Sequence, residues 1–356
     1  MNTRVSKRYA QTLFSAVALS VLSITASAQD GHDQDKLYVL SSIKPVHSLV
    51  AMVTGDLANS EIIVKGAASP HTYALAPAQA RDIQRADAIF WVGEDLEAFL
   101  EKPLATIGAR ATLIELMETP GLQKMKFREG GAFEKHDDHD DDDDDDDDDD
   151  HDDDHDDDHG HDDDHDKHDD HDEDHDDDHG NHDDHDGFDP HIWLNPNNAK
   201  RILAYIASAL GDLDPDNKAA YIANATAAMQ DIDQLTDAIT DNLSPIKNGG
   251  FLLFHDSFQY FEHAFGLAAS GAISIHPEVA PGARRIAEIR RLLRKRNVRC
   301  VFTEPQFDAK MVDVILQGTG KRAVEIDPLG AALPQGDTLY FELMQAMSTS
   351  FRKCLG

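Results

Sequence analysis

The chain has 356 residues, of which 32 are basic and 68 acidic, and a formal net charge of −36 at pH 7. This charge has the wrong sign for neutralising phosphates and argues against nucleic acid as a partner. The charge is concentrated in residues 136–186, which hold 34 acidic residues, 13 of the 20 histidines and a single base, Lys167. The rest of the chain is therefore close to neutral.

The N-terminus has the composition of a secretory signal. Basic residues precede a mostly apolar run over Leu13–Ile24, and Ala26-Ser27-Ala28 forms a small-residue cleavage site. We expect residues 1–28 to be removed and the product to be exported in soluble form to a periplasm. No cysteine stands directly after the cleavage site, where a lipid could be attached, and no other apolar run approaches the ~20 residues of a membrane span. We therefore expect no membrane anchor.

Before residue 120 the chain alternates strands with helices. We predict strands at Leu37–Ser42, Glu61–Val64, Ala88–Val92 and Thr112–Leu116, and helices from Val46 and over Ala78–Ala86 and Leu96–Ala105. This spacing indicates βαβ units and a parallel sheet.

Two helical stretches follow residue 186, at Pro196–Leu210 and Pro215–Leu243, and we expect Gly211 and Pro215 to break the chain between them. Proline is tolerated at a helix start because its missing N–H would have had no partner. At 1.5 Å per residue the second stretch spans ~43 Å, enough to cross a whole lobe. It is therefore our candidate for a rigid link between two lobes.

The C-terminal part repeats the alternation. We predict strands at Phe251–Phe254, Ala272–Ile275, Cys300–Thr303 and Ala323–Ile326, and helices at Phe258–Phe265, Gly282–Arg296, Ala309–Gly318 and Thr338–Arg352. The fold class is thus α/β with two lobes, each a mainly parallel sheet flanked by helices. The expected boundaries are an N-terminal lobe at 29–213 with an insertion at 136–186, a linking helix at 214–243 and a C-terminal lobe at 244–356.

Four residues are candidates for a site in the cleft between these lobes. Ligands of open α/β sheets bind beyond the carboxyl ends of the strands. His255 and Asp327 each end an apolar strand, His71 lies in the loop beyond one, and His191 lies where the insertion rejoins the fold. Three imidazoles and a carboxylate suit a tetrahedral zinc site.

Each candidate also has a structural interpretation. His71 could be a surface loop residue, Asp256 could cap the helix after His255 with Gln259 three positions later, and Asp327 before Pro328 could belong to a turn. Four histidines remain outside residues 136–186. We expect His47, His263 and His276 to make local hydrogen bonds, with a place near the cleft as the alternative for His276, and His32 to lie in the frayed N-terminus.

The insertion 136–186 is interpreted as a low-affinity metal collector. A solvated acidic spacer is the alternative, but a spacer has no need of histidine, and histidine-rich tracts are typical metal binders. Because the segment lacks apolar residues to bury and its like charges repel, we expect it to be disordered. Its auxiliary ligands are His136, His139, His151, His155, His159, His161, His165, His168, His171, His175, His179, His182 and His185.

Cys300 and Cys354 are the two cysteines of the chain. In an oxidising compartment we expect them to form a disulfide that closes a loop of about 55 residues, worth ~4 kcal/mol in the chain-entropy model. The alternative is two buried free thiols.

An ordered set of motifs resembles the solute-binding proteins of bacterial zinc and manganese ABC transporters, most closely the high-affinity zinc-uptake, ZnuA type. The likeness runs from about Leu37 to the C-terminus and rests on Gly66–Tyr73, Asp189–Pro196, Phe254–Phe261, Ser274–Glu278, Thr303–Phe307 and Glu325–Gly330. The resemblance implies two α/β lobes joined by a long helix, with the metal bound between them and delivered to a membrane permease. By position, it implies His71, His191, His255 and Asp327 as ligands.

Two details of the resemblance bear on the metal. Manganese-type relatives place a glutamate where this chain has His255, and a third imidazole favours zinc over a hard, oxygen-preferring ion. Some zinc-type members carry a glutamate directly before the first ligand histidine, where this chain has Pro70. Asp327 or a water molecule is then left as the fourth ligand. An acidic, histidine-rich insertion is also typical of the zinc type.

The leading interpretation is a monomeric periplasmic receptor that captures Zn²⁺ and passes it to an ABC permease, with a periplasmic zinc metallochaperone as a further candidate partner. One alternative is a zinc buffer or chaperone whose whole function lies in the insertion. A second alternative is a zinc hydrolase, with Glu278 or Glu304 as general base. The absence of a His-Glu-x-x-His motif and of a nucleophile elbow argues against an enzyme.

Overall fold

The computed structural model describes residues 36–128, 187–246, 249–274, 281–295, 298–308 and 310–356. The expected signal peptide at 1–28 and the insertion at 136–186 with its thirteen histidines lie outside the described residues. His32, His276 and Glu278 also lie outside them.

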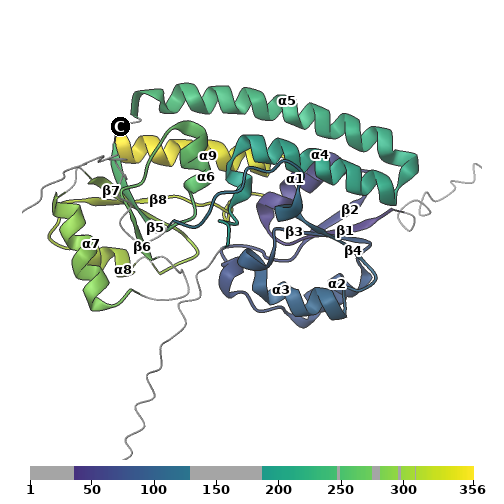
Figure 1. Ribbon diagram of the computed structural model, residues 1–356, viewed down its shortest axis with the longest axis horizontal. Coiled ribbons are helices and arrows are strands. Elements are labelled where there is room, and N and C mark those ends of the chain that lie inside the picture. Colours follow the sequence, from purple (N-terminus) through teal and green to yellow (C-terminus); the bar gives the residue numbers. More distant parts are fainter. Residues whose placement is uncertain (1–35, 129–186, 247–248, 275–280, 296–297, 309) are drawn as a thin grey trace, which may run out of the picture. The chain divides into compact units, whose positions relative to one another are not determined.

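The first sheet has four parallel strands in the order β2-β1-β3-β4 (Figure 1). They are β1 (Tyr38–Ser41), β2 (Asn59–Ile62), β3 (Ala88–Trp91) and β4 (Thr112–Glu115), and the helices between them are α1 (Lys44–Thr54), α2 (Pro77–Arg85) and α3 (Glu94–Thr106). The expected alternation is confirmed. The other three strands differ from their expected bounds by a single residue at one or both ends, whereas β2 lies two residues earlier than expected, because its pairing with β1 begins at Tyr38 opposite Asn59.

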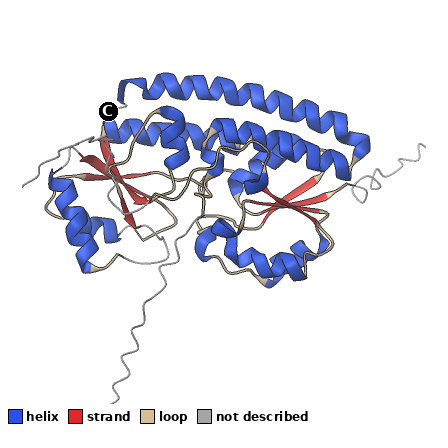
Figure 2. Ribbon diagram, viewed as in Figure 1, coloured by secondary structure: helices blue, strands red, loops and turns tan. Residues whose placement is uncertain are grey.

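The second sheet repeats this arrangement in the order β6-β5-β7-β8, again with all strand pairs parallel. Figure 2 shows the strands in two separate groups, each with helices beside it. Its strands are β5 (Gly250–His255), β6 (Ala272–Ser274), β7 (Val298–Thr303) and β8 (Arg322–Glu325), and its helices are α6 (Gln259–Phe265), α7 (Ala283–Lys295), α8 (Lys310–Leu316) and α9 (Leu339–Leu355). Both sheets therefore reverse the direction of strand addition once, between β1 and β3 and between β5 and β7. Such switch points leave a crevice at the carboxyl ends of the strands.

Two long helices connect the sheets: α4 (Pro196–Leu213) and α5 (Lys218–Leu243). The expected break at Gly211 is wrong, because α4 continues through it. A Cβ at Gly211 would lie 2.7 Å from Cγ of Lys218, so glycine here lets the end of α4 approach the start of α5. The expected start of the second helix at Pro215 is also wrong, because Pro215–Asn217 forms a short 3-10 turn.

Helix α5 has 26 residues, or about 39 Å at 1.5 Å per residue, and packs on α1, α4, α6 and α9 (Figure 1). Its buried residues recur every three or four positions along one stripe: Tyr221, Ala225, Ala228, Ile232, Leu235, Ile239 and Leu243. The stripe joins an apolar core that is continuous from the first sheet to the second. Helix α5 therefore packs against helices associated with both sheets.

Among the described helices, none combines the length and the apolar character needed to cross a membrane.

Cys300 and Cys354 form a disulfide, as expected, with their Cα atoms 5.6 Å apart. Cys300 lies in β7 and Cys354 near the end of α9, and both residues are fully buried. The bond therefore fastens the C-terminal helix to the sheet it covers.

Replacing both cysteines by serine should destabilise the protein without weakening metal binding. The disulfide closes a loop across a sequence separation of 54 residues, and the lost constraint on the unfolded chain is worth about 4 kcal/mol. Thermal unfolding, followed by circular dichroism with and without reductant, measures the effect. An unchanged melting temperature on reduction would contradict this account.

Candidate metal centre

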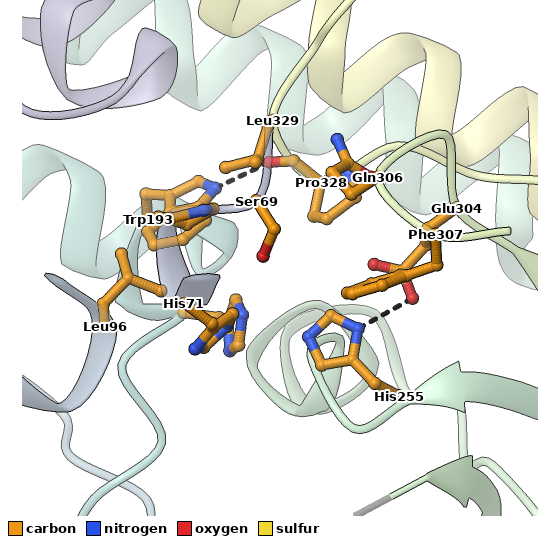
Figure 3. Close-up of a pocket in the computed structure, with 12 residues that line it drawn as sticks. Ser69, His71, Leu96, Trp193, His255, Glu304, Gln306, Phe307, Pro328 and Leu329 are labelled. Carbon is orange, nitrogen blue, oxygen red and sulfur yellow. Dashed lines mark hydrogen bonds and ion pairs between the residues drawn. The ribbon is translucent and has the colours of Figure 1, made fainter. Parts of the chain in front are cut away.

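Three histidines from three separate segments line one cavity and bring their ring nitrogens together. Figure 3 labels two of them, His71 and His255. His71 lies in the 3-10 turn Pro70–Thr72 beyond β2, His191 directly precedes the turn Ile192–Leu194, and His255 is the last residue of β5. His191 and His255 are buried, with 5% and 4% of their surface exposed, and His71 is partly buried. The fold thus gathers side chains that lie up to 184 positions apart in the sequence, from His71 to His255.

The three imidazoles are placed as a ligand set. Each offers one nitrogen, and these nitrogens lie within 4.8 Å of one another. The ring centroids of His191 and His255 are 5.3 Å apart, and His71 lies 5.6 and 5.7 Å from these two rings. Nitrogens bound to one tetrahedral zinc at about 2.0–2.1 Å would be about 3.3 Å apart, so small ring movements toward the centre suffice.

Two of the rings are oriented by carboxylates. His191 Nδ1 lies 2.7 Å from Asp189 Oδ1, and His255 Nδ1 lies 2.8 Å from Glu304 Oε1. An ionised carboxylate only accepts hydrogen bonds, so each Nδ1 carries the proton and each Nε2 keeps its lone pair. Nε2 of His255 is buried and has no hydrogen-bond partner among the described residues. This is the usual arrangement of metal-binding histidines.

Burial keeps two of the rings neutral. It lowers the pKa of His71 and His191 well below the usual imidazole value, and neighbouring imidazoles lower both further. Burial also raises the pKa of Asp189 to about 7, although the backbone N–H of His191 and the charge of Arg128 oppose the shift. Above that pH, Asp189 is a carboxylate that accepts from His191, and both rings are in the neutral form that metals require.

His255 titrates differently. Burial lowers its pKa, but the charge of Glu304 and its hydrogen bond outweigh burial, and the pKa of His255 is raised. Of the three rings, His255 is therefore the first to take up a proton as the pH falls.

Apolar side chains enclose the centre. The ring centroid of Trp193 lies 5.3 Å from that of His191, and the ring centroid of Phe307 lies 5.2 Å from that of His255. Leu96 and Leu329 also line the cavity. The free volume is about 10 Å³, roughly that of one water molecule. The space beside the three rings therefore has room for about one ion or one water molecule.

Asp327, the expected fourth ligand, lies outside the group of converging ligand atoms and does not line the cavity. Its Oδ1 accepts from Gln306 Nε2 at 2.8 Å and from the backbone N–H of Leu329 at 3.0 Å, and its Oδ2 accepts from Ala331 N–H at 2.5 Å. These bonds fix the loop that follows β8. In this arrangement Asp327 has the turn role that the sequence offered as its alternative.

Lys44 of α1 fastens the same loop to the first part of the chain. Its Nζ donates to the backbone oxygens of Gly330, Ala331 and Leu333 at 2.6, 3.0 and 2.6 Å. All three protons of the buried ammonium group are thereby used. The loop that carries Asp327 is therefore held by α1.

The capping interpretation of Asp256 and Gln259 is wrong. No side chain caps α6, because Asp256 contacts Arg128 and Gln259 donates to the backbone oxygen of Lys126. His263 makes a hydrogen bond, as expected, with 2.9 Å between its Nε2 and Nε2 of Gln123, but the partner lies 140 positions away in sequence and is therefore not local. His47 is buried in α1, away from the three-histidine group.

Sequence reasoning missed the roles of Asp189 and Glu304. Asp189 stands two residues before His191, close enough for a local side-chain bond, and this spacing was a usable signal. Glu304 directly follows β7, the neighbour of β5, so it reaches the same sheet edge as His255.

The fold and the site define the class: a two-sheet α/β protein in which three histidines that could hold a metal ion converge beyond the strand ends. A model of the family described as zinc-uptake complex component A, periplasmic (ZnuA), matches residues 39–354. The chain belongs to this family. It is 45% identical over 317 residues to the high-affinity zinc uptake system protein ZnuA of Brucella abortus, covering 89% of this chain and 91% of that protein.

Other relatives agree. The protein of the same name from Paracoccus denitrificans is 36% identical over 346 residues, covering 97% of this chain and 98% of its own. Among solved structures, a crystal structure of ZnuA has a TM-score of 0.68 at 22% identity, covering 90% of this chain and all of that one. A Zn(II)-bound mutant variant of AdcAII from Streptococcus pneumoniae has a TM-score of 0.67 at 20% identity, and the match covers 91% of this chain and 100% of that one. These two structures establish the shared fold.

Replacing His71, His191 or His255 by alanine should weaken zinc binding at least about a hundredfold, because each change removes a ligand and outer-shell changes alone cost 10–100-fold. His263→Ala, which alters a histidine outside the group, is the matched control and should bind as the wild type does. Competition with a zinc chelator measures the affinity. An unchanged affinity in His255→Ala would refute the ligand set.

Glu304→Gln should shift the pH dependence of zinc binding. Zinc needs neutral imidazole, so affinity falls as the pH drops through the raised pKa of His255. Without the carboxylate, the largest influence that raises this pKa is removed, so the pKa of His255 falls and the loss of affinity should move to lower pH. Zinc affinity of both forms, measured by competition over a series of pH values, reports the shift. A midpoint that stays in place or rises would contradict it.

Proposed function

We propose that this protein is a periplasmic receptor that binds one Zn²⁺ tightly and delivers it to the membrane permease of an ABC transporter for import. The observation that carries the proposal is the convergence of His71, His191 and His255 within 4.8 Å, with carboxylates behind two of the rings. The zinc-uptake names of the relatives support the same conclusion.

Zinc is the cargo that this donor set favours. Three neutral imidazoles are borderline ligands that suit zinc, whereas manganese prefers carboxylate and carbonyl oxygens. Asp327 would have to leave three hydrogen bonds to reach the centre, so water is the fourth ligand that this arrangement supports. A labile water also leaves one coordination position open for transfer of the ion.

The cavity argues against hydrolysis as the function. A catalytic zinc needs room for a substrate beside its water, but the free volume here is about 10 Å³. A receptor needs only to enclose the ion between lobes and release it at the permease. Enclosure by apolar side chains such as Trp193 and Phe307 serves that purpose, because it slows exchange with solvent water.

We further propose roles for two segments outside the described residues: residues 1–28 act as a cleaved signal peptide, and residues 136–186 collect zinc at low affinity through many similar ligands. We also propose that the chain is divided into an N-terminal lobe at 29–213, a linking segment at 214–243 and a C-terminal lobe at 244–356. The receptor acts as a monomer, and a periplasmic zinc metallochaperone is a candidate donor of the ion.

Growth of a deletion strain in chelated medium tests the transport role. The wild-type gene should restore growth and uptake of radioactive zinc, His255→Ala should restore neither, and a variant lacking 136–186 should restore both when zinc is moderately scarce. A receptor is required for import at low zinc, whereas a buffer only assists.

Two outcomes would contradict the proposal. Full zinc uptake by His255→Ala would separate transport from the three-histidine centre. Loss of uptake on removal of 136–186, with the tight centre intact, would favour the insertion as the functional element.

A further inference from the structure

A buried ionic cluster beside the metal centre has no part in the ligand set. Arg128, the last described residue before 129–186, contacts both Asp256 and Glu262. Its Nε lies 2.9 Å from Asp256 Oδ2, and its Nη1 and Nη2 lie 3.1 and 2.9 Å from the two Glu262 oxygens. Nη2 also contacts Asp256 Oδ1. One guanidinium thus engages all four oxygens of two carboxylates.

The geometry of the cluster requires arginine. The side chains of Arg128, Asp256 and Glu262 are 21%, 14% and 4% exposed, so two carboxylates are buried around one cation. Without the cation they would repel each other and lose the hydrogen bonds that the guanidinium donates. A lysine supplies the charge but not the planar fork that meets two carboxylates at once.

The cluster binds the segment before the insertion to the part of the chain that carries His255. Asp256 directly follows that ligand, and Glu262 lies on α6, where it also accepts from the backbone N–H of Ala269 at 2.6 Å. Arg128 therefore attaches its own segment to the start of the β5–α6 loop and to the helix behind it.

The same segment holds the other buried ligand. Met125 O accepts from Asp189 N–H at 2.8 Å, and the hydroxyl of Tyr260 on α6 donates to Asp189 O at 2.9 Å while accepting from Met125 N–H at 3.0 Å. Asp189 in turn holds the ring of His191. The position of His191 relative to α6 thus depends on residues 125–128.

We propose that Arg128 is a positioning residue that sets the spacing between His191 and His255, and with it the affinity for zinc. The inference rests on the proposed function, because it takes this centre as the tight zinc site. The antiparallel bridge between Lys126 and Phe188 joins the two chain segments that flank the insertion at the same place.

The test compares Arg128→Gln, Arg128→Lys and the wild type in the full chain. Arg128→Gln should weaken zinc binding on the order of tenfold or more, as loss of an outer-shell partner does. Arg128→Lys should recover only part of the affinity, because it restores the charge without the fork. Lys200→Gln, which breaks an ion pair between α4 and α5, is the matched control and should bind zinc as the wild type does.

Two further readouts separate positioning from general stability. Urea unfolding should show both Arg128 variants folded under the binding conditions. In the metal-free proteins, long-range ¹H–¹⁵N spectra of labelled histidine should show Nδ1-protonated rings for His191 and His255 in the wild type. In Arg128→Gln, tautomer averaging should reduce these signals, because Asp189 is no longer fixed.

Wild-type affinity in Arg128→Lys would overturn the proposal, since charge alone would then suffice. Unchanged imidazole spectra in Arg128→Gln would overturn it as well. A wild-type protein without a tight zinc site would instead refute the proposed function, and the metal-free spectra would still decide the role of Arg128.

Discussion

The hydrogen bonds from Asp189 to His191 and from Glu304 to His255 are the constraint on which the centre depends. A free imidazole can turn over or move its proton, and in either case the lone pair that should face the ion is lost. A buried carboxylate on Nδ1 fixes both the tautomer and the ring plane. The two lobes supply one pair each, so the site is complete only when both are in register.

That register is maintained by polar contacts as well as by the continuous apolar core. Trp193 donates its indole N–H to Pro328 O at 3.0 Å, and Tyr340 donates to Trp193 O at 3.0 Å. Lys44 holds the loop after β8, and Arg128 holds the segment before the insertion. Each contact joins chain segments far apart in sequence. The centre is therefore buried between sheets that long-range polar bonds and α5 keep together.

Much of this organisation could be predicted from the sequence, and the exceptions have physical causes. Alternating apolar strands and amphipathic helices are local signals, and they indicated both sheets. His255 could be predicted to lie at the site because it ends a strand, and ligands of open sheets bind beyond the strand ends. The partners Glu304 and Arg128 could not be predicted, because their roles depend on which strands and loops become neighbours. Gly211 was misread because glycine breaks a helix in isolation, whereas here it permits close packing against Lys218.

The central claim is that zinc binds to His71, His191 and His255, and that His191 and His255 bind it through Nε2. A crystal structure of the zinc-loaded protein, with anomalous scattering recorded at the zinc edge, tests it most directly. The account predicts one strong peak at about 2.0–2.1 Å from one nitrogen of His71 and from Nε2 of His191 and His255, with the two carboxylates still on Nδ1. A peak bound through Nδ1 of His191 or His255, or one displaced from the three rings, would contradict it.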